Sequence, residues 1–305
     1  MAGFVRTTAM AAGAVGGLSV SMCGLLVEQS KRARRVIGRP HGKPLRADGV
    51  YLPDGTGPLP PGDPQAAGPL RFAVLGDSSA AGLGADDQDH LPGVLIARAL
   101  AEDTNRPVRL DTYAVSGSTS RNIAPQVRLA LANTPQIALI IVGGNDVTAR
   151  IQPRESGELL AEAVAQLRAA GIAVVVGTCP DLGMIRPIPQ PLRTLARAWS
   201  LSVARHQRAA VRRTGGHAVP LADLLAAEFL SRDDYFSVDR FHPSDAGYEA
   251  AAEVLLPAVF AAAGTWEAGP LPVPPVRSTA GGARQSAVKL VATANRLLNR
   301  RDLAA

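Results

Sequence analysis

The sequence predicts an α/β fold in which a central parallel β-sheet carries helices on both faces. Two observations lead to this prediction. Short apolar runs alternate along the body of the chain with longer segments that have the amphipathic spacing of helices. One run, Ile137–Val142, is wholly aliphatic, as is typical of a strand buried on both faces of a sheet. Strands that alternate with helices are joined by crossover connections and are therefore expected to lie parallel.

Five strands and five helices are expected in the body of the chain. The predicted strands are Leu70–Leu75, Val108–Ala114, Ile137–Val142, Ile172–Gly177 and His217–Leu221. The predicted helices are Gly93–Glu102, Arg121–Ala132, Glu155–Ala169, Leu192–Arg213 and Ser244–Ala263. Polar and glycine-containing segments follow several of the strands. Since the ligand site of such a sheet lies at the carboxyl ends of its strands, these segments are the first place to look for chemistry.

Composition divides the chain of 305 residues into four segments. These are an N-terminal anchor or signal-like segment with a basic cluster (1–37), a Pro/Gly-rich linker (38–69), the main domain (70–264), and a Pro/Gly-rich linker with a basic tail (265–305). The net charge of +6 arises in the flanks, because residues 69–264 hold 18 Lys and Arg against 20 Asp and Glu. Basic flanks favour an anionic membrane surface. With only 4% aromatic residues to stack on bases, the chain is not expected to bind nucleic acid.

The uncharged run Thr7–Val27 is about long enough to cross a bilayer, which takes roughly 20 apolar residues. An uncleaved anchor is preferred over a cleaved signal, a lipid-modified Cys23 or a buried helix, because no clean cleavage site follows. The basic cluster Lys31–Arg35 favours the cytoplasmic side, whereas export would place the domain on the other side. The tail Arg284–Leu303 has the pattern of a basic amphipathic helix, either at a membrane surface or in solvent. The protein is therefore expected to be membrane-associated or exported, with the side left open.

A serine that directly follows the first predicted strand is the candidate nucleophile. Ser78 lies in the segment Gly76–Gly82, at or near a helix N-terminus, among small residues that let a substrate approach the backbone. A serine hydroxyl needs a base, and histidine suits because its ordinary pKa lies near neutrality. Asp239 and His242, three residues apart in one loop, can form such a pair, with the carboxylate orienting the imidazole. Taken alone, each segment is also explained as an ordinary turn or helix cap.

Two further segments carry candidate hydrogen-bond donors. Asn145 follows the most apolar strand, and its side-chain amide is a neutral donor that suits a developing oxyanion. Gly117 follows the second strand and can present its backbone N–H without a side chain in the way. Turn chemistry explains either segment alone, since Gly, Asn and Ser are common turn residues.

Together, the four segments resemble the sequence blocks of the SGNH hydrolases, the GDSL-type esterase and lipase superfamily. The resemblance covers about residues 70–263 and includes the Asp-x-x-His spacing. It implies a flavodoxin-like three-layer α/β/α sandwich. Ser79 stands where the name motif has leucine, which leaves the subfamily open.

The resemblance also implies roles for individual residues. Ser78 corresponds to the nucleophile, and Asp239 and His242 to the pair that handles its proton. The backbone N–H groups of Ser78 and Gly117, together with the Asn145 side chain, correspond to the oxyanion hole.

The implied activity is that of a serine esterase that cleaves short- to medium-chain acyl esters, with lipids and thioesters as further substrates. An acyltransferase that uses the same acyl-enzyme and a non-catalytic membrane-anchored binding module are the alternatives. The segment Cys179–Leu192 is expected to line the acyl pocket through Leu182, Met184, Ile185 and Ile188, unless these residues pack within the loop. The sequence has no phosphate-binding loop, complete dinucleotide fingerprint or metal motif, so neither a cofactor nor a metal is expected. The expected partner is an ester or lipid substrate, and no obligate protein partner is evident.

Overall fold

The structure, a computed structural model, describes residues 22–38 and 43–266. A six-stranded sheet in the order β1-β3-β2-β4-β5-β6 forms its centre. The strands are β1 (Gly49–Tyr51), β2 (Leu70–Gly76), β3 (Val108–Thr112), β4 (Ile137–Ile141), β5 (Ala173–Gly177) and β6 (His217–Val219). Strands β2 to β6 run parallel, and their order is the flavodoxin-like one. The predicted fold class is confirmed, and every predicted strand is present with small shifts at its ends.

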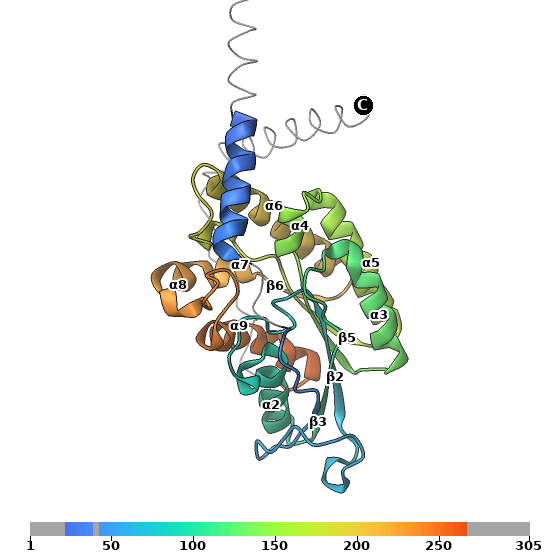
Figure 1. Ribbon diagram of the computed structural model, residues 1–305. Helices are drawn as coiled ribbons and strands as arrows, with labels where there is room; N and C mark the ends of the chain where they lie inside the picture. Colours follow the sequence, from blue (N-terminus) through green and yellow to red (C-terminus); the bar gives the residue numbers. More distant parts are fainter. Residues whose placement is uncertain (1–21, 39–42, 267–305) are drawn as a thin grey trace, which may run out of the picture.

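Helices cover both faces of the sheet and give the molecule three layers (Figure 1). Their bounds are α2 (Pro92–Thr104), α3 (Ile123–Ala132), α4 (Gly144–Thr148), α5 (Pro153–Ala169), α6 (Leu192–Arg213), α7 (Leu221–Leu224), α8 (Ala226–Ser231) and α9 (Asp245–Ala263). Helices α2 and α9 cover one face, and α3, α5 and α6 the other. Because side chains alternate along a strand, Phe72 and Val74 of β2 join the first core cluster and Ala73 and Leu75 the second.

The predicted linker 38–69 contains a strand that its composition does not predict. Within it, β1 adds an antiparallel edge strand to β3, with Val50 opposite Arg109. The Tyr51 side chain is fully buried, and its hydroxyl donates a hydrogen bond to the Ala47 carbonyl at 2.5 Å. A strand of three residues is too short to show a periodic pattern, and the surrounding Pro and Gly residues favour turns, so β1 could not be predicted from the sequence.

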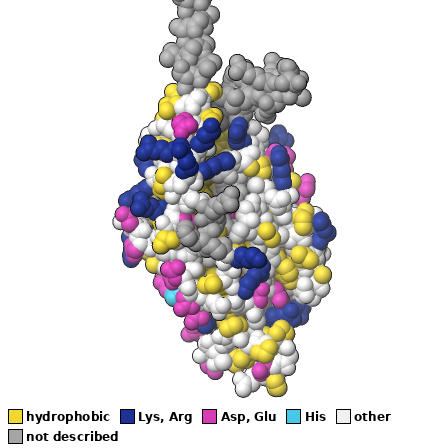
Figure 2. Space-filling model, viewed as in Figure 1, with side chains coloured by type: hydrophobic (Ala, Val, Ile, Leu, Met, Phe, Trp, Pro, Cys, Tyr) yellow, Lys and Arg dark blue, Asp and Glu magenta, His cyan; other side chains and the backbone are white. Residues whose placement is uncertain are grey.

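Residues 22–37 form a helix that rests on the domain. Its Ala33 side chain is buried, and its Gln29 side chain bonds to both the Gln190 carbonyl and the Leu192 N–H, at 2.5 and 3.1 Å. Figure 2 shows Lys and Arg side chains gathered on the part of the surface next to this helix.

The predicted anchor Thr7–Val27 lies mostly outside the described residues, and the predicted tail helix Arg284–Leu303 lies wholly outside them. Among the described residues, α9 is the one helix that is long and apolar enough to cross a bilayer. Its residues Leu255 and Val259 are fully buried in the core, which is the usual environment of a sheet-covering helix. Membrane association therefore stays a prediction from the sequence.

We expect Tyr51→Ala to lower the free energy of unfolding by about 3–5 kcal/mol, the usual effect of removing a buried aromatic side chain. Urea denaturation followed by circular dichroism measures this change. Leu129→Ala is the control, because the Leu129 side chain on α3 is 57% exposed and its loss should change stability by less than about 0.5 kcal/mol. An equally small change for Tyr51→Ala would mean that β1 is not part of the cooperatively folded unit.

Candidate active site

Ser78 lies at the carboxyl edge of the sheet, two residues beyond the end of β2. Gly76 ends the strand with a φ of +138°, and a Cβ at this position would overlap with the Ile141 carbonyl oxygen of β4. Only glycine permits this close approach. The chain then continues through turns, and the next α-helix, α2, begins only at Pro92. The expectation that Ser78 lies at or near a helix N-terminus is therefore wrong, because the small residues after it form turns.

Ser78, His242 and Asp239 form a continuous chain of hydrogen bonds. His242 Nε2 lies 3.0 Å from Ser78 Oγ, and His242 Nδ1 lies 2.6 Å from Asp239 Oδ2. The Ser78 and His242 residues are buried, and so is the Asp239 side chain. The sequence predicted these three residues as a group, and the structure brings them together. Chemically, the arrangement can move a proton from the serine to the imidazole while the carboxylate fixes the imidazole orientation.

The Asp239 carboxylate is saturated with donors. Besides His242 Nδ1, its oxygens accept hydrogen bonds from Ser237 Oγ at 2.8 Å, from the Phe241 N–H at 2.8 Å and from the His242 N–H at 2.9 Å. Burial on its own would raise the pKa of Asp239, but the hydrogen bonds from His242 and Phe241 outweigh it and hold the pKa well below its usual range. Asp239 therefore stays a carboxylate at neutral pH.

The loop that carries Asp239 and His242 packs directly on the loop that follows β2. This second loop carries Ser78, the candidate nucleophile, and is here called the nucleophile loop. Gly84 has a φ of +104°, and a Cβ there would lie 2.5 Å from the Pro243 carbonyl oxygen and 2.9 Å from His242 Cβ. From α9, the Tyr248 hydroxyl donates to the Leu83 carbonyl at 2.7 Å. These contacts set the position of the imidazole relative to Ser78.

Gly117 lies in the loop after β3 and Asn145 in α4 after β4, so the two segments flank the loop of Ser78 after β2. The loop after β3 is joined to Gly76 by a bond from the Val115 N–H to the Gly76 carbonyl at 3.1 Å. Asn145, in α4 just after β4, donates from Nδ2 to the Ser118 carbonyl at 3.0 Å. Gly117 precedes Ser118 in an exposed turn with a φ of +84°. Because an amide nitrogen has two hydrogens, Asn145 has a second N–H to offer a ligand.

A buried polar network beneath these loops was not foreseen from the sequence. The carboxylate of Asp146 is fully buried and accepts hydrogen bonds from the Ser120 N–H at 2.8 Å and from the Ser120 and Ser156 hydroxyls at 2.5 Å each. Gln207 Nε2 of α6 donates to Ser156 Oγ at 3.1 Å and to the Val142 carbonyl at 3.2 Å. Asp146 directly follows Asn145 in the segment after the most apolar strand, and this is the one sequence signal that points to it. Its partners come from distant elements that only folding brings together.

Asp77, next to Ser78, is a second buried carboxyl group. One of its oxygens accepts a hydrogen bond from the Ser79 N–H at 2.9 Å. Burial raises the pKa of Asp77 to about 6, since the desolvated charged form is disfavoured. The nearby charge of Asp146 raises this pKa further, while the Ser79 hydrogen bond and His242 lower it.

With the fold and these contacts in view, the chain can be compared with known proteins. Residues 74–250 match the GDSL-like Lipase/Acylhydrolase family. The chain belongs to this family. The resemblance to the SGNH, or GDSL-type, hydrolases is thereby confirmed, and the protein is a carboxylic ester hydrolase.

Two relatives of this GDSL-type hydrolase carry functional names. The chain is 43% identical over 251 residues to the GDSL-like esterase Rv1075c of Mycobacterium tuberculosis. The matched region covers 81% of this chain and 80% of that protein. It is 30% identical over 210 residues to the spore germination lipase LipC of Bacillus licheniformis. This matched region covers 61% of this chain and 94% of that protein.

Two solved structures have a similar fold. The crystal structure of TesA has a TM-score of 0.50 at 24% identity, with 63% of this chain and 97% of that chain covered. A mutant of Axe2, an acetyl-xylooligosaccharide esterase from Geobacillus, has a TM-score of 0.51 at 17% identity, with 66% and 96% covered. At these identities, the likeness supports the fold alone.

The apolar residues of the segment after β5 do not form the expected acyl pocket. Leu182, Met184, Ile185 and Ile188 are at most 9% exposed and belong to the core cluster that also contains Ala33 of the N-terminal helix. Their side chains pack within the protein, so the alternative interpretation, loop packing, is the one the structure favours.

Because burial raises the pKa of Asp77 from 3.8 to about 6, the folded protein keeps a proton between about pH 4 and 6 that the unfolded chain releases. The stability linked to this proton is lost as the pH rises through that window. Asp77→Asn cannot ionise, so its free energy of unfolding, relative to that of the unsubstituted protein, should rise from pH 4 to pH 7. Chemical denaturation at several pH values measures the difference.

The exposed Asp103, substituted by Asn, is the matched control for this pH series. The raised pKa of Asp77 would be contradicted if the free energies of unfolding of the Asp77→Asn variant and the unsubstituted protein differed by the same amount at every pH.

Proposed function

We propose that this GDSL-type hydrolase is a serine esterase that cleaves short- to medium-chain acyl esters through an acyl-enzyme on Ser78. The observation that carries the proposal is the unbroken hydrogen-bond chain from Asp239 through His242 to the Ser78 hydroxyl. The names of its relatives, an esterase and a lipase, agree with ester cleavage. A non-catalytic binding module would have no need for a buried nucleophile aligned with its base.

In the first half of the reaction, Ser78 Oγ attacks the ester carbonyl carbon while His242 Nε2 takes the hydroxyl proton. The carbonyl oxygen becomes an oxyanion, which the N–H groups of Ser78 and Gly117 and the Asn145 amide stabilise. His242 then gives its proton to the leaving oxygen, so the alcohol departs and the acyl group stays on Ser78. Asp239 remains ionised throughout and stabilises the imidazolium that forms in between.

In the second half, a water molecule attacks the acyl carbon, and His242 takes the proton of that water. Collapse of the second oxyanion breaks the bond to Ser78 Oγ, and His242 returns the proton to the serine. The products are one carboxylic acid and one alcohol, and the enzyme is regenerated.

Ser78→Ala should lower the turnover of p-nitrophenyl butyrate by about 10⁴-fold or more, since the nucleophile is lost. It should also abolish labelling by a fluorophosphonate probe. Ser79→Ala, which removes the neighbouring hydroxyl, is the control and should keep both turnover and labelling. Persistent labelling of the Ser78→Ala protein would reject Ser78 as the nucleophile.

Asn145→Ala should lower kcat by roughly 100- to 1000-fold, the usual effect of removing one oxyanion donor. The bond to the Ser118 carbonyl is also lost, so the free energy of unfolding should fall by about 1 kcal/mol. Steady-state kinetics and urea denaturation measure the two effects separately. A kcat near that of the unsubstituted enzyme would exclude Asn145 from the oxyanion hole.

A further inference from the structure

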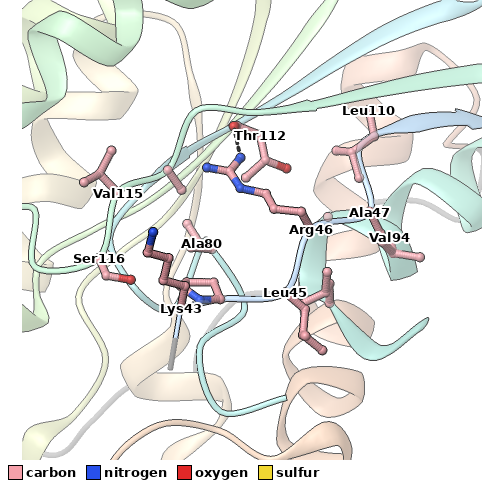
Figure 3. A pocket seen from close by; sticks show the side chains of 15 residues that line it. Lys43, Leu45, Arg46, Ala47, Ala80, Val94, Leu110, Thr112, Val115 and Ser116 are labelled. Carbon is pink, nitrogen blue, oxygen red and sulfur yellow. Dashed lines mark hydrogen bonds between the residues drawn. The ribbon is translucent and has the colours of Figure 1, made fainter. Parts of the chain in front are cut away.

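A pocket of about 290 Å³ lies beside the nucleophile loop (Figure 3). Its inner walls are Ala80 and Ala81, from the turns that follow Ser78, and residues 114–116, which lead into Gly117. Its outer wall is the segment of residues 43–47, here called the strap. The pocket therefore touches two of the segments that supply groups to the proposed acyl-enzyme chemistry, those of Ser78 and Gly117.

The strap is fixed to the end of β3. Arg46 Nη1 donates to the Thr112 carbonyl at 2.8 Å, and the Thr112 N–H donates to Asp48 Oδ1 at 3.0 Å. The buried Tyr51 hydroxyl holds the Ala47 carbonyl from the other side. The strap lies outside residues 74–250, the region that matches the family.

The position of His242 indicates which part of an ester occupies the pocket. The leaving oxygen has to lie near His242 Nε2, because the imidazole returns its proton there. None of the residues that line the pocket comes from the loop that carries Asp239 and His242. The acyl part of the ester, on the other side of the carbonyl carbon, is therefore the part that points into the pocket.

The size and walls of the pocket suit a short acyl chain. The volume of the pocket is about 290 Å³. It lies at the lower end of the usual range for ligand sites. Leu45 of the strap, Leu91, Val94 and Leu110 give it apolar walls.

The strap also brings positive charge to the pocket. Lys43 and Arg46 line it, and no acidic side chain does. Arg46 is engaged by the Thr112 carbonyl and by Asp48 at 3.4 Å. Lys43 forms no ion pair with any carboxylate in the described part of the chain, and Figure 3 shows its side chain extending along the pocket toward Ser116. Lys43 is exposed, so its ammonium group lies at the solvent side of the pocket. An apolar pocket with an ammonium group at this position is complementary to an apolar stem that ends in an anion.

We propose that this pocket is the acyl subsite of the enzyme, and that it selects a short acyl group bearing a carboxylate, as in a monoester of a short dicarboxylic acid. The proposal rests on the proposed esterase function. Leu45 limits the length of the acyl chain, and Lys43 pairs with its carboxylate.

The charge selection is tested with two esters, p-nitrophenyl butyrate and mono-p-nitrophenyl succinate. The acyl chain of the first ends in a methyl group, and that of the second ends in a carboxylate. The ratio of kcat/KM for succinate over butyrate should fall by about 10- to 100-fold in Lys43→Met, the range for losing a charge-assisted hydrogen bond. Lys31→Met removes the same charge from the N-terminal helix, away from the pocket, and should leave the ratio unchanged. Uncatalysed hydrolysis of each ester is subtracted.

The location of the subsite is tested by filling it. Leu45→Trp should lower kcat/KM for p-nitrophenyl hexanoate relative to p-nitrophenyl acetate by about tenfold, because even one methylene group changes selectivity by that order. Leu129→Trp, on the exposed surface of α3, should leave the chain-length profile unchanged. Ratios of two substrates within one variant do not depend on the fraction of folded enzyme, so poor folding cannot imitate either result.

The proposal is supported if both ratios fall in the strap variants and neither falls in the controls. It is overturned if Lys43→Met changes the succinate ratio no more than Lys31→Met does, or if Leu45→Trp leaves the chain-length profile unchanged. Failure of the esterase function itself gives a different result, since the unsubstituted protein would then hydrolyse neither ester and take up no fluorophosphonate.

Discussion

The buried carboxylate of Asp146 is the constraint on which the arrangement of the active-site loops depends. A carboxylate without contact to water is strongly unfavourable unless donors surround it. Here the donors come from Ser120, in the loop after β3, and from Ser156, in α5. Gln207 of α6 extends the network to the carbonyl that follows β4. Satisfying one buried group therefore fixes three segments of chain at once.

This constraint reaches the substrate side of the site through its immediate neighbours. Asn145 directly precedes Asp146, and Ser120 lies three residues beyond Gly117. Two of the candidate oxyanion donors, Gly117 and Asn145, therefore lie close in sequence to residues that this carboxylate network holds, and the bond from Asn145 to the Ser118 carbonyl links their two segments. The position of β2 between β3 and β4 then places Ser78 between their loops. A flavodoxin-like sheet that is closed at this edge by polar bonds is well suited to chemistry that needs little movement of the protein.

The sequence predicted most of the sheet because buried parallel strands are continuous apolar runs, and it predicted the site because serine, glycine, asparagine and histidine follow those runs. It did not predict β1, whose three residues are too few for a pattern. It placed a helix too close to Ser78, because small residues are equally compatible with turns. Ser156 and Gln207 face the interior from helices, where polar residues usually face solvent, so the network of Asp146 was missed. Leu182 and its apolar neighbours were assigned to a pocket because apolarity alone does not distinguish core from ligand site.

Ser78 and His242 are separated by 164 residues, and this has a consequence for biosynthesis. A nascent chain emerges N-terminal end first, so the nucleophile leaves the ribosome long before its base. The loop that contains His242 is held by α9 through Tyr248 and by contact with Gly84, so the catalytic pair is complete only when the end of the domain has been made and packed. The proposed pair of Ser78 and His242 can therefore form only after the C-terminal end of the domain has left the ribosome.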